Sequence, residues 1–142
     1  MSRVLGMDMG ERFLGLALSD SLKITSQGLE TLKRENLEED LNRLKEIIDR
    51  HQVDRIVVGL PRNMNGTYGP QAEKALGFIQ FLEQELDMPI VAWDERLSTQ
   101  AANRVLLEAD VSRKKRKAVV NQVAAQLILQ GYLDRMRWER YT

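Results

Sequence analysis

The spacing of apolar residues along the chain begins with a strand-like pattern. Two short apolar runs, 4–8 and 14–18, are separated by a segment that contains Gly10, and they predict two strands joined by a tight turn. A third and more polar strand is expected over 23–33. Its charged side chains suit an antiparallel edge strand, because charges discourage unwanted pairing with other chains.

The period then changes to that of helices alternating with buried strands. Apolar residues at 37, 41, 44 and 48 lie on one face of a helix over 37–51. The continuous apolar run 55–59 predicts a central parallel strand. A second helix is expected over 72–86, a further buried strand over 89–93, a helix from the capping residue Ser98 to about 109, and a last helix over 115–134.

This order of elements predicts an α/β fold built on a mixed five-stranded sheet. The first three strands are expected to form antiparallel hairpins. Since helical crossovers join strands that run parallel, the two later strands should lie parallel to the first. Helices are therefore expected on both faces of the sheet.

Length and composition limit the classes of protein that remain. The 142 residues suit one domain, 1–142, and 21 basic residues balance 21 acidic ones, which excludes a globally basic nucleic-acid binder. There is no cysteine and only one histidine, so a metal site must use oxygen ligands. Without a targeting segment or a run of about 18 apolar residues, we expect a cytoplasmic protein with no membrane partner.

Asp8 is the first candidate for chemistry, because it ends an apolar strand between Gly6 and Gly10. A carboxylate in such a place is costly to bury unless it is paired or binds a metal. It could instead accept hydrogen bonds from its own turn. Sugar kinases and actin-like ATPases also place an acid at such a hairpin, but they need two domains, whereas metal-dependent polynucleotidyl transfer in a ribonuclease H-like fold needs one sheet.

Glu95 is the second candidate, because it follows the predicted strand 89–93 and precedes Arg96. Taken alone, a surface ion pair with a neighbouring cation explains it more simply. If Glu95 faces Asp8, the two carboxylates would repel each other unless Mg²⁺ or Mn²⁺ lay between them. Asp94 points to the opposite side in an extended chain, so only one of the adjacent acids should face the site.

Several blocks of sequence together resemble the YqgF/RuvX family, and they cover nearly the whole chain in order. The family is described as Holliday junction resolvases and as nucleases that mature the 5′ end of pre-16S ribosomal RNA, with a ribonuclease H-like fold. The resemblance thus implies metal-dependent phosphodiester hydrolysis. It rests on Gly6-Met7-Asp8-Met9-Gly10, Gly15-Leu16-Ala17-Leu18-Ser19-Asp20, Val58-Gly59-Leu60-Pro61-Arg62-Asn63-Met64-Asn65-Gly66, Asp94-Glu95-Arg96-Leu97-Ser98-Thr99 and Ala124-Ala125-Gln126-Leu127-Ile128-Leu129.

The same resemblance assigns catalytic and metal-binding roles to Asp8 and Glu95, and it places Asn121 where the family carries a third acid. Asparagine offers a neutral oxygen without charge, so metal affinity should be lower or a second ion lost. Asp134 cannot replace it, because thirteen helical residues span about 20 Å. Phe13 is a second departure, at a position where the family often carries a basic residue.

The expected nucleic-acid contacts lie around this candidate site. Arg12 and Arg96 flank the two acids, and the loop 61–69 should overhang the same sheet edge, where its polar groups could bond phosphate or sugar and its aromatic ring could stack on a base. The basic run 113–117 could neutralise phosphates, although a solvated loop would also explain it. The assigned contacts are Arg12, Asn63, Asn65, Tyr68, Arg96, Arg113, Lys114, Lys115 and Arg116.

The leading hypothesis is a Mg²⁺- or Mn²⁺-dependent nuclease acting on RNA, in maturation of the 5′ end of pre-16S ribosomal RNA. A Holliday junction resolvase acting on branched DNA uses the same chemistry and stays open. A nucleic-acid-binding protein with weakened catalysis is a third interpretation, suggested by Asn121. A phosphotransferase fragment would require nucleotide binding. The chain is expected to be a monomer or a homodimer.

Overall fold

The computed structural model describes residues 2–61, 65–94 and 113–141, and only the backbone of 113–119, 140 and 141. The predicted helix over 98–109 lies outside these residues. The described part contains strands and helices in the order β1 (Arg3–Met9), β2 (Phe13–Ser19), β3 (Ser26–Lys33), α1 (Leu37–His51), β4 (Val53–Leu60), α2 (Pro70–Glu85), β5 (Ile90–Asp94) and α4 (Arg113–Tyr141).

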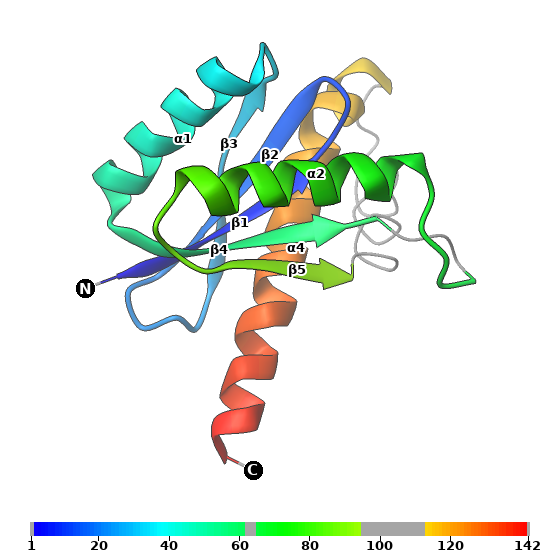
Figure 1. Cartoon of the computed structure of the whole chain (residues 1–142). Helices are drawn as coiled ribbons and strands as arrows, with labels where there is room; N and C mark the ends of the chain where they lie inside the picture. Colours follow the sequence, from blue (N-terminus) through cyan, green and yellow to red (C-terminus); the bar gives the residue numbers. More distant parts are fainter. Residues whose placement is uncertain (1, 62–64, 95–112, 142) are drawn as a thin grey trace.

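The strands form one five-stranded sheet with the order β3-β2-β1-β4-β5. β2 pairs antiparallel with both β1 and β3, whereas β4 pairs parallel with both β1 and β5. The mixed topology predicted from the sequence is therefore confirmed. Parallel pairing brings the carboxyl ends of β1, β4 and β5 to the same side of the sheet (Figure 1).

Helices cover both faces of the sheet, as predicted (Figure 1). On one face, α1 and α2 pack against alternate residues of β1, including Leu5 and Met7. On the other face, α4 packs against Val4 of β1 and Val57 of β4. Because successive side chains of a strand point to opposite faces, each central strand contributes to both cores.

The two outer strands differ from the prediction in one respect each. β3 begins at Ser26, three residues later than predicted, because the backbone amides of Ile24 and Thr25 donate to the carboxylate of Asp20 and form a turn there. β5 was expected to be buried, but its residues are half-buried or exposed. The reason is its position, since it is the last strand in the order of the sheet.

α4 begins two residues earlier than predicted and continues seven residues further, to Tyr141. The sequence pattern predicts a buried stripe of Val120, Val123, Ala124, Leu127 and Gly131 on this helix, and the structure confirms it only in part. Ala124 of that stripe is buried, but Leu127 is 36% exposed. The other buried side chains on the described part of this helix are Ala125, Ile128, Leu129, Tyr132 and Leu133. α4 packs very close to β1, since a Cβ atom at Gly6 would stand 2.7 Å from the Cβ of Leu129. Small residues such as Ala124 and Ala125 allow the helix to approach the sheet this closely.

Glutamines of α4 cover the beginning of the β3 edge. Gln130 accepts a hydrogen bond from the Ser26 amide at 2.9 Å and donates one to the Ile24 carbonyl at 2.9 Å, while Gln126 donates to the Ser26 carbonyl at 3.3 Å. These bonds satisfy backbone groups that an edge strand leaves unpaired. Within the described ranges, no helix has the length and apolar character needed to cross a membrane.

Candidate functional site

Asp8 lies near the carboxyl end of β1 and is almost buried, with 5% of its surface exposed. Its neighbours Met7 and Met9 point into the core beneath α1 and α2. Asp8 therefore points to the other face of the sheet, the face that α4 covers. Across the sheet it stands opposite Gly15 of β2.

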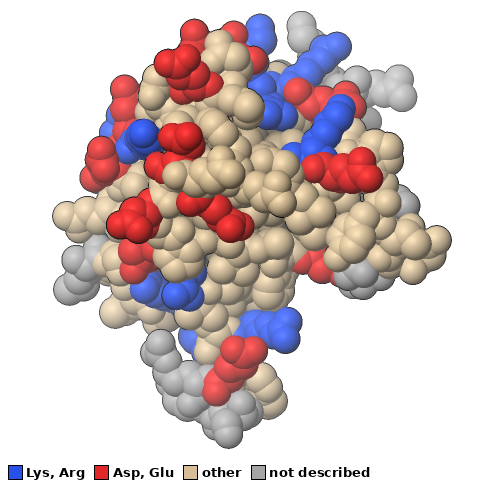
Figure 2. All heavy atoms as spheres, viewed as in Figure 1, with Lys and Arg blue, Asp and Glu red and all other residues tan. Residues whose placement is uncertain are grey.

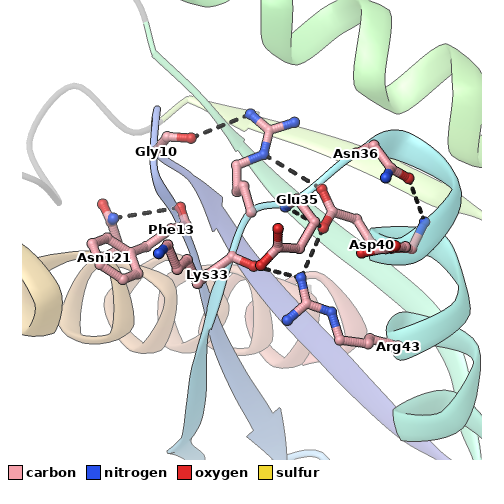
Figure 3. Close-up of polar contacts among 10 residues, drawn as sticks. Gly10, Phe13, Lys33, Glu35, Asn36, Asp40, Arg43 and Asn121 are labelled. Carbon is pink, nitrogen blue, oxygen red and sulfur yellow. Dashed lines mark hydrogen bonds and ion pairs between the residues drawn. The ribbon is translucent and has the colours of Figure 1, made fainter.

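Asn121 lies on α4 directly over the β1–β2 hairpin. A Cβ atom at Gly15 would be 1.9 Å from the backbone oxygen of Asn121, and one at Gly10 would be 2.6 Å from its side-chain nitrogen. That nitrogen, Nδ2, donates to the carbonyl of Phe13 at 3.5 Å (Figure 3). The structure thus brings Asn121 to the same face of the hairpin as Asp8, and the amide oxygen of Asn121 is the atom not used in the bond to Phe13.

Three of the predicted site residues, Glu95, Arg96 and Asn63, lie outside the described residues. Glu95 follows directly after Asp94, the last residue of β5. Asp94 pairs with Leu60, the last residue of β4. Asp94, which directly precedes Glu95 in the sequence, therefore lies at the carboxyl-terminal end of the parallel strands.

The β1–β2 turn carries Arg12, whose side chain is exposed. The turn is closed by a hydrogen bond from the amide of Gly10 to the carbonyl of Phe13, at 2.9 Å. Gln71, in the first turn of α2, donates to the carboxylate of Glu11 at 2.9 Å. This contact places the beginning of α2, which follows the 61–69 loop, beside the hairpin.

Within that loop, Asn65 forms bonds that shape the chain. Its side-chain oxygen accepts a hydrogen bond from the Thr67 amide at 3.0 Å and from the Thr67 hydroxyl at 2.6 Å. Gly66 between them has φ of 88°, a conformation that favours glycine. Tyr68 is 52% exposed, so its ring is accessible for stacking.

The basic run 113–116 forms the first turn of α4, five to eight residues before Asn121 (Figure 1). The side chains of this run lie outside the described part. On the opposite face, which α1 and α2 cover, Lys and Arg are intermixed with Asp and Glu (Figure 2). That face offers no large basic surface to nucleic acid.

Arg34, which the sequence did not identify as a site residue, reaches the same hairpin from the end of β3. Its Nη1 donates to the carbonyl of Gly10 at 3.3 Å, and its amide donates to the carbonyl of Arg12 at 2.7 Å. The only signal in the sequence was a basic residue just after a strand and before the helix-capping Asn36, which indicates no particular partner.

The donor atoms at the hairpin suit a hard divalent cation. A carboxylate at Asp8 and an amide oxygen at Asn121 are the kind of oxygen ligands that Mg²⁺ and Mn²⁺ bind. No group of three His, Cys, Asp or Glu that could hold a metal occurs among the residues for which coordinates are described. A group of three such ligands would have to include a residue outside them.

Comparison with known proteins gives related sequences over almost the full length. The family described as RuvX, Holliday junction resolvase, matches residues 2–135. A relative from Desulforamulus reducens is 54% identical over 93% of this chain and 96% of its own, and one from Clostridium acetobutylicum is 56% identical over 93% and 98%. Both carry the name "Putative pre-16S rRNA nuclease".

Solved structures of two resolvases share the fold. RuvC of T. thermophilus, in complex with a Holliday junction substrate, has a TM-score of 0.58 and 17% identity, covering 96% of both chains. The fowlpox virus resolvase, also in complex with Holliday junction DNA, has a TM-score of 0.56 and 11% identity, covering 94% of this chain and 98% of its own. The fold is therefore ribonuclease H-like, as expected.

Proposed function

Since this chain belongs to the RuvX Holliday junction resolvase family and is a nuclease, we propose that it uses a divalent cation to mature the 5′ end of pre-16S ribosomal RNA in the cytoplasm. The choice of RNA follows the names of relatives that are more than half identical to this chain. The chain acts as a monomer or a homodimer.

The single observation that carries the proposal is the buried carboxylate of Asp8 on the face of the hairpin that Asn121 covers. A carboxylate removed from water is stabilised by an adjacent cation. Asp8 and Glu95 would hold Mg²⁺ or Mn²⁺, with the Asn121 oxygen as a neutral third ligand. Such an ion lowers the pKa of an attacking water and offsets the charge that develops on the phosphate.

The remaining residues would bind and orient the substrate. Arg12 is exposed on the turn that follows Asp8, so its guanidinium can pair with a backbone phosphate. Arg96 and the basic run 113–116 would do the same on either side. Tyr68 would stack on an unpaired base, and Asn63 and Asn65 would line the loop that approaches the RNA.

Two other functions have observations in their favour. The structural neighbours RuvC and the fowlpox resolvase were solved with Holliday junctions, which favours branched DNA as the substrate. Asn121 stands where the family carries an acid, which favours a protein that binds nucleic acid and cleaves it weakly. A divalent cation titration with both substrates separates these functions.

The test is a cleavage assay of the full chain on single-stranded RNA spanning the 5′ end of 16S ribosomal RNA and on a four-way DNA junction. We expect RNA cleavage that requires Mn²⁺ or Mg²⁺ and falls by about 10³-fold or more in Asp8→Asn, because the variant loses a charged metal ligand. Asp49→Asn is the matched control, since Asp49 is exposed on α1.

Each contrary result would change a different part of the proposal. Cleavage of the junction but not the RNA would replace RNA with branched DNA as the substrate. Binding of either nucleic acid without cleavage at any cation concentration would support the weakened nuclease. Equal cleavage by Asp8→Asn and Asp49→Asn would overturn the assigned metal site.

A further inference from the structure

Asp40 is a buried carboxylate that the proposed chemistry does not use. It lies in the first turn of α1 and is 1% exposed. Its oxygens accept hydrogen bonds from Nη2 of Arg43 at 2.8 Å and from the amide of Glu35 at 3.1 Å, and one lies 3.7 Å from Nε of Arg34 (Figure 3). Asp40 therefore fixes the direction of two arginines.

Arg34 extends this network to the β1–β2 hairpin. The Nη1 atom bonds the Gly10 carbonyl, the backbone amide bonds the Arg12 carbonyl, and the guanidinium carbon lies 5.5 Å from the centre of the Phe78 ring of α2. Arg34 is thus held by a carboxylate on one side, a ring on another and the hairpin on a third. Its side chain is 21% exposed.

The hairpin that Arg34 holds is the one that carries the candidate site. Gly10 is two residues beyond Asp8 and packs against the side chain of Asn121. Arg12, on the same turn, is a proposed phosphate ligand. A shift of this turn would move all of these groups relative to one another, and small displacements of reacting groups have large effects on rate.

We infer that Arg34 is a positioning residue. Through its contacts with Asp40 and Gly10, it holds the β1–β2 hairpin, which carries Asp8, in place against Asn121. The inference rests on the proposed nuclease function for its effect on rate. A planar guanidinium can pair with Asp40 through Nε and bond Gly10 through Nη1 at the same time. A lysine carries its three donors on a single nitrogen, so it cannot reproduce contacts that arginine makes from two separate nitrogens.

Arg43 provides a matched control within the same network. It pairs with the same carboxylate and has a similar exposure of 33%. Its other hydrogen bond, however, goes to the carbonyl of Lys33 and not to the hairpin. A purely structural role for the network predicts equal effects of Arg34→Lys and Arg43→Lys, whereas a positioning role predicts different ones.

The experiment compares Arg34→Lys and Arg43→Lys in full-length protein by steady-state cleavage of RNA and by amide hydrogen exchange of Gly10. We expect kcat of Arg34→Lys to fall by about tenfold or more with KM changed less than about twofold, and Arg43→Lys to stay within about twofold for both. Exchange of the Gly10 amide, which closes the hairpin, should accelerate by about tenfold in Arg34→Lys alone, measured relative to the core amide of Ile56.

Normalisation to Ile56 removes any difference in global stability between the two variants. If Arg34→Lys does not fold, Arg34→Gln gives the same comparison, because it also loses the double contact. Equal changes in Gly10 exchange in the Arg34 and Arg43 variants would overturn the inference. Absence of cleavage by the unmodified protein would refute the proposed function, while the exchange measurement would still decide whether Arg34 holds the hairpin.

Discussion

Asn121 is the residue at which the family resemblance predicts an acid in place of the amide. It lies against Gly10 and Gly15 on the same side of the hairpin as Asp8, where a third acid would add negative charge. The amide is neutral, so the metal-free protein avoids repulsion between carboxylates. A neutral ligand also attracts a cation less strongly than a charged one does.

Asn121→Asp is therefore expected to raise the affinity for Mn²⁺ by about tenfold and to lower the melting temperature of the metal-free protein. Titration calorimetry measures the affinity, and thermal unfolding with and without Mn²⁺ shows whether the added cation restores the stability. Asn42→Asp, at an exposed position of α1, adds the same charge away from the site. Identical responses of the two variants to Mn²⁺ would refute a role for position 121 in metal binding.

The turn between β2 and β3 shows how one side chain sets the start of an element. Hydrogen bonds from the amides of Ile24 and Thr25, with a smaller contribution from the charge of Arg3, hold the pKa of Asp20 below its ordinary value of 3.8. Lys23 has φ of 59°, so the turn reverses the chain before β3 begins. The sequence alone extended β3 to Lys23 because this local competition has no periodic signal.

The lowered pKa of Asp20 gives a pH dependence with a definite sign. Because the ionised form is favoured in the folded protein, its stabilising effect is present above the unfolded value near 3.8 and is lost as the pH falls through the lower folded value. We expect Asp20→Ala to lower the urea midpoint at neutral pH, with a difference from the unmodified protein that shrinks below pH 3.8. Urea unfolding across this range, with Asp49→Ala to account for the loss of charge, tests it; a constant difference would contradict it.

For the whole molecule, the close approach of α4 to the sheet matters most, because it brings Asn121 onto the hairpin. Glycines at 6, 10 and 15 leave room for the helix. The approach is closest at Gly15, where a Cβ atom would stand 1.9 Å from the backbone oxygen of Asn121. A methyl group there can be accommodated only if α4 or β2 moves. At Gly77 of α2, by contrast, a Cβ atom would have no other atom within 4 Å beyond its own helix turn.

Gly15→Ala is expected to destabilise the fold by about 3 kcal/mol or more, since overpacking against backbone cannot relax through side-chain rotation. Gly77→Ala should stabilise it by about 0.5 to 1 kcal/mol through helix propensity. Chemical unfolding measures both. Similar free energies of unfolding for the two variants would mean that α4 does not contact β2 as closely as the structure indicates.

The sequence determined the elements of this protein because their signals are local. Periods of two and of three to four residues predicted the bounds of α1 and which strands run antiparallel and which parallel. The pattern Gly6-Met7-Asp8-Met9-Gly10 identified the acid near the end of β1. The family resemblance then gave the nuclease function and the ribonuclease H-like fold, both of which the comparisons confirmed.

Only the tertiary structure decided which distant residues meet. That Asn121 lies over the hairpin, that β5 is a half-exposed edge strand, and that Arg34 links Asp40 to Gly10 all depend on contacts between segments far apart in sequence. Such contacts arise from the packing of elements on the sheet, and no periodicity along the chain records them. Arg34 and Arg43, for example, look alike in the sequence. In the fold, Arg34 bonds the Gly10 carbonyl of the hairpin, whereas Arg43 bonds the Lys33 carbonyl.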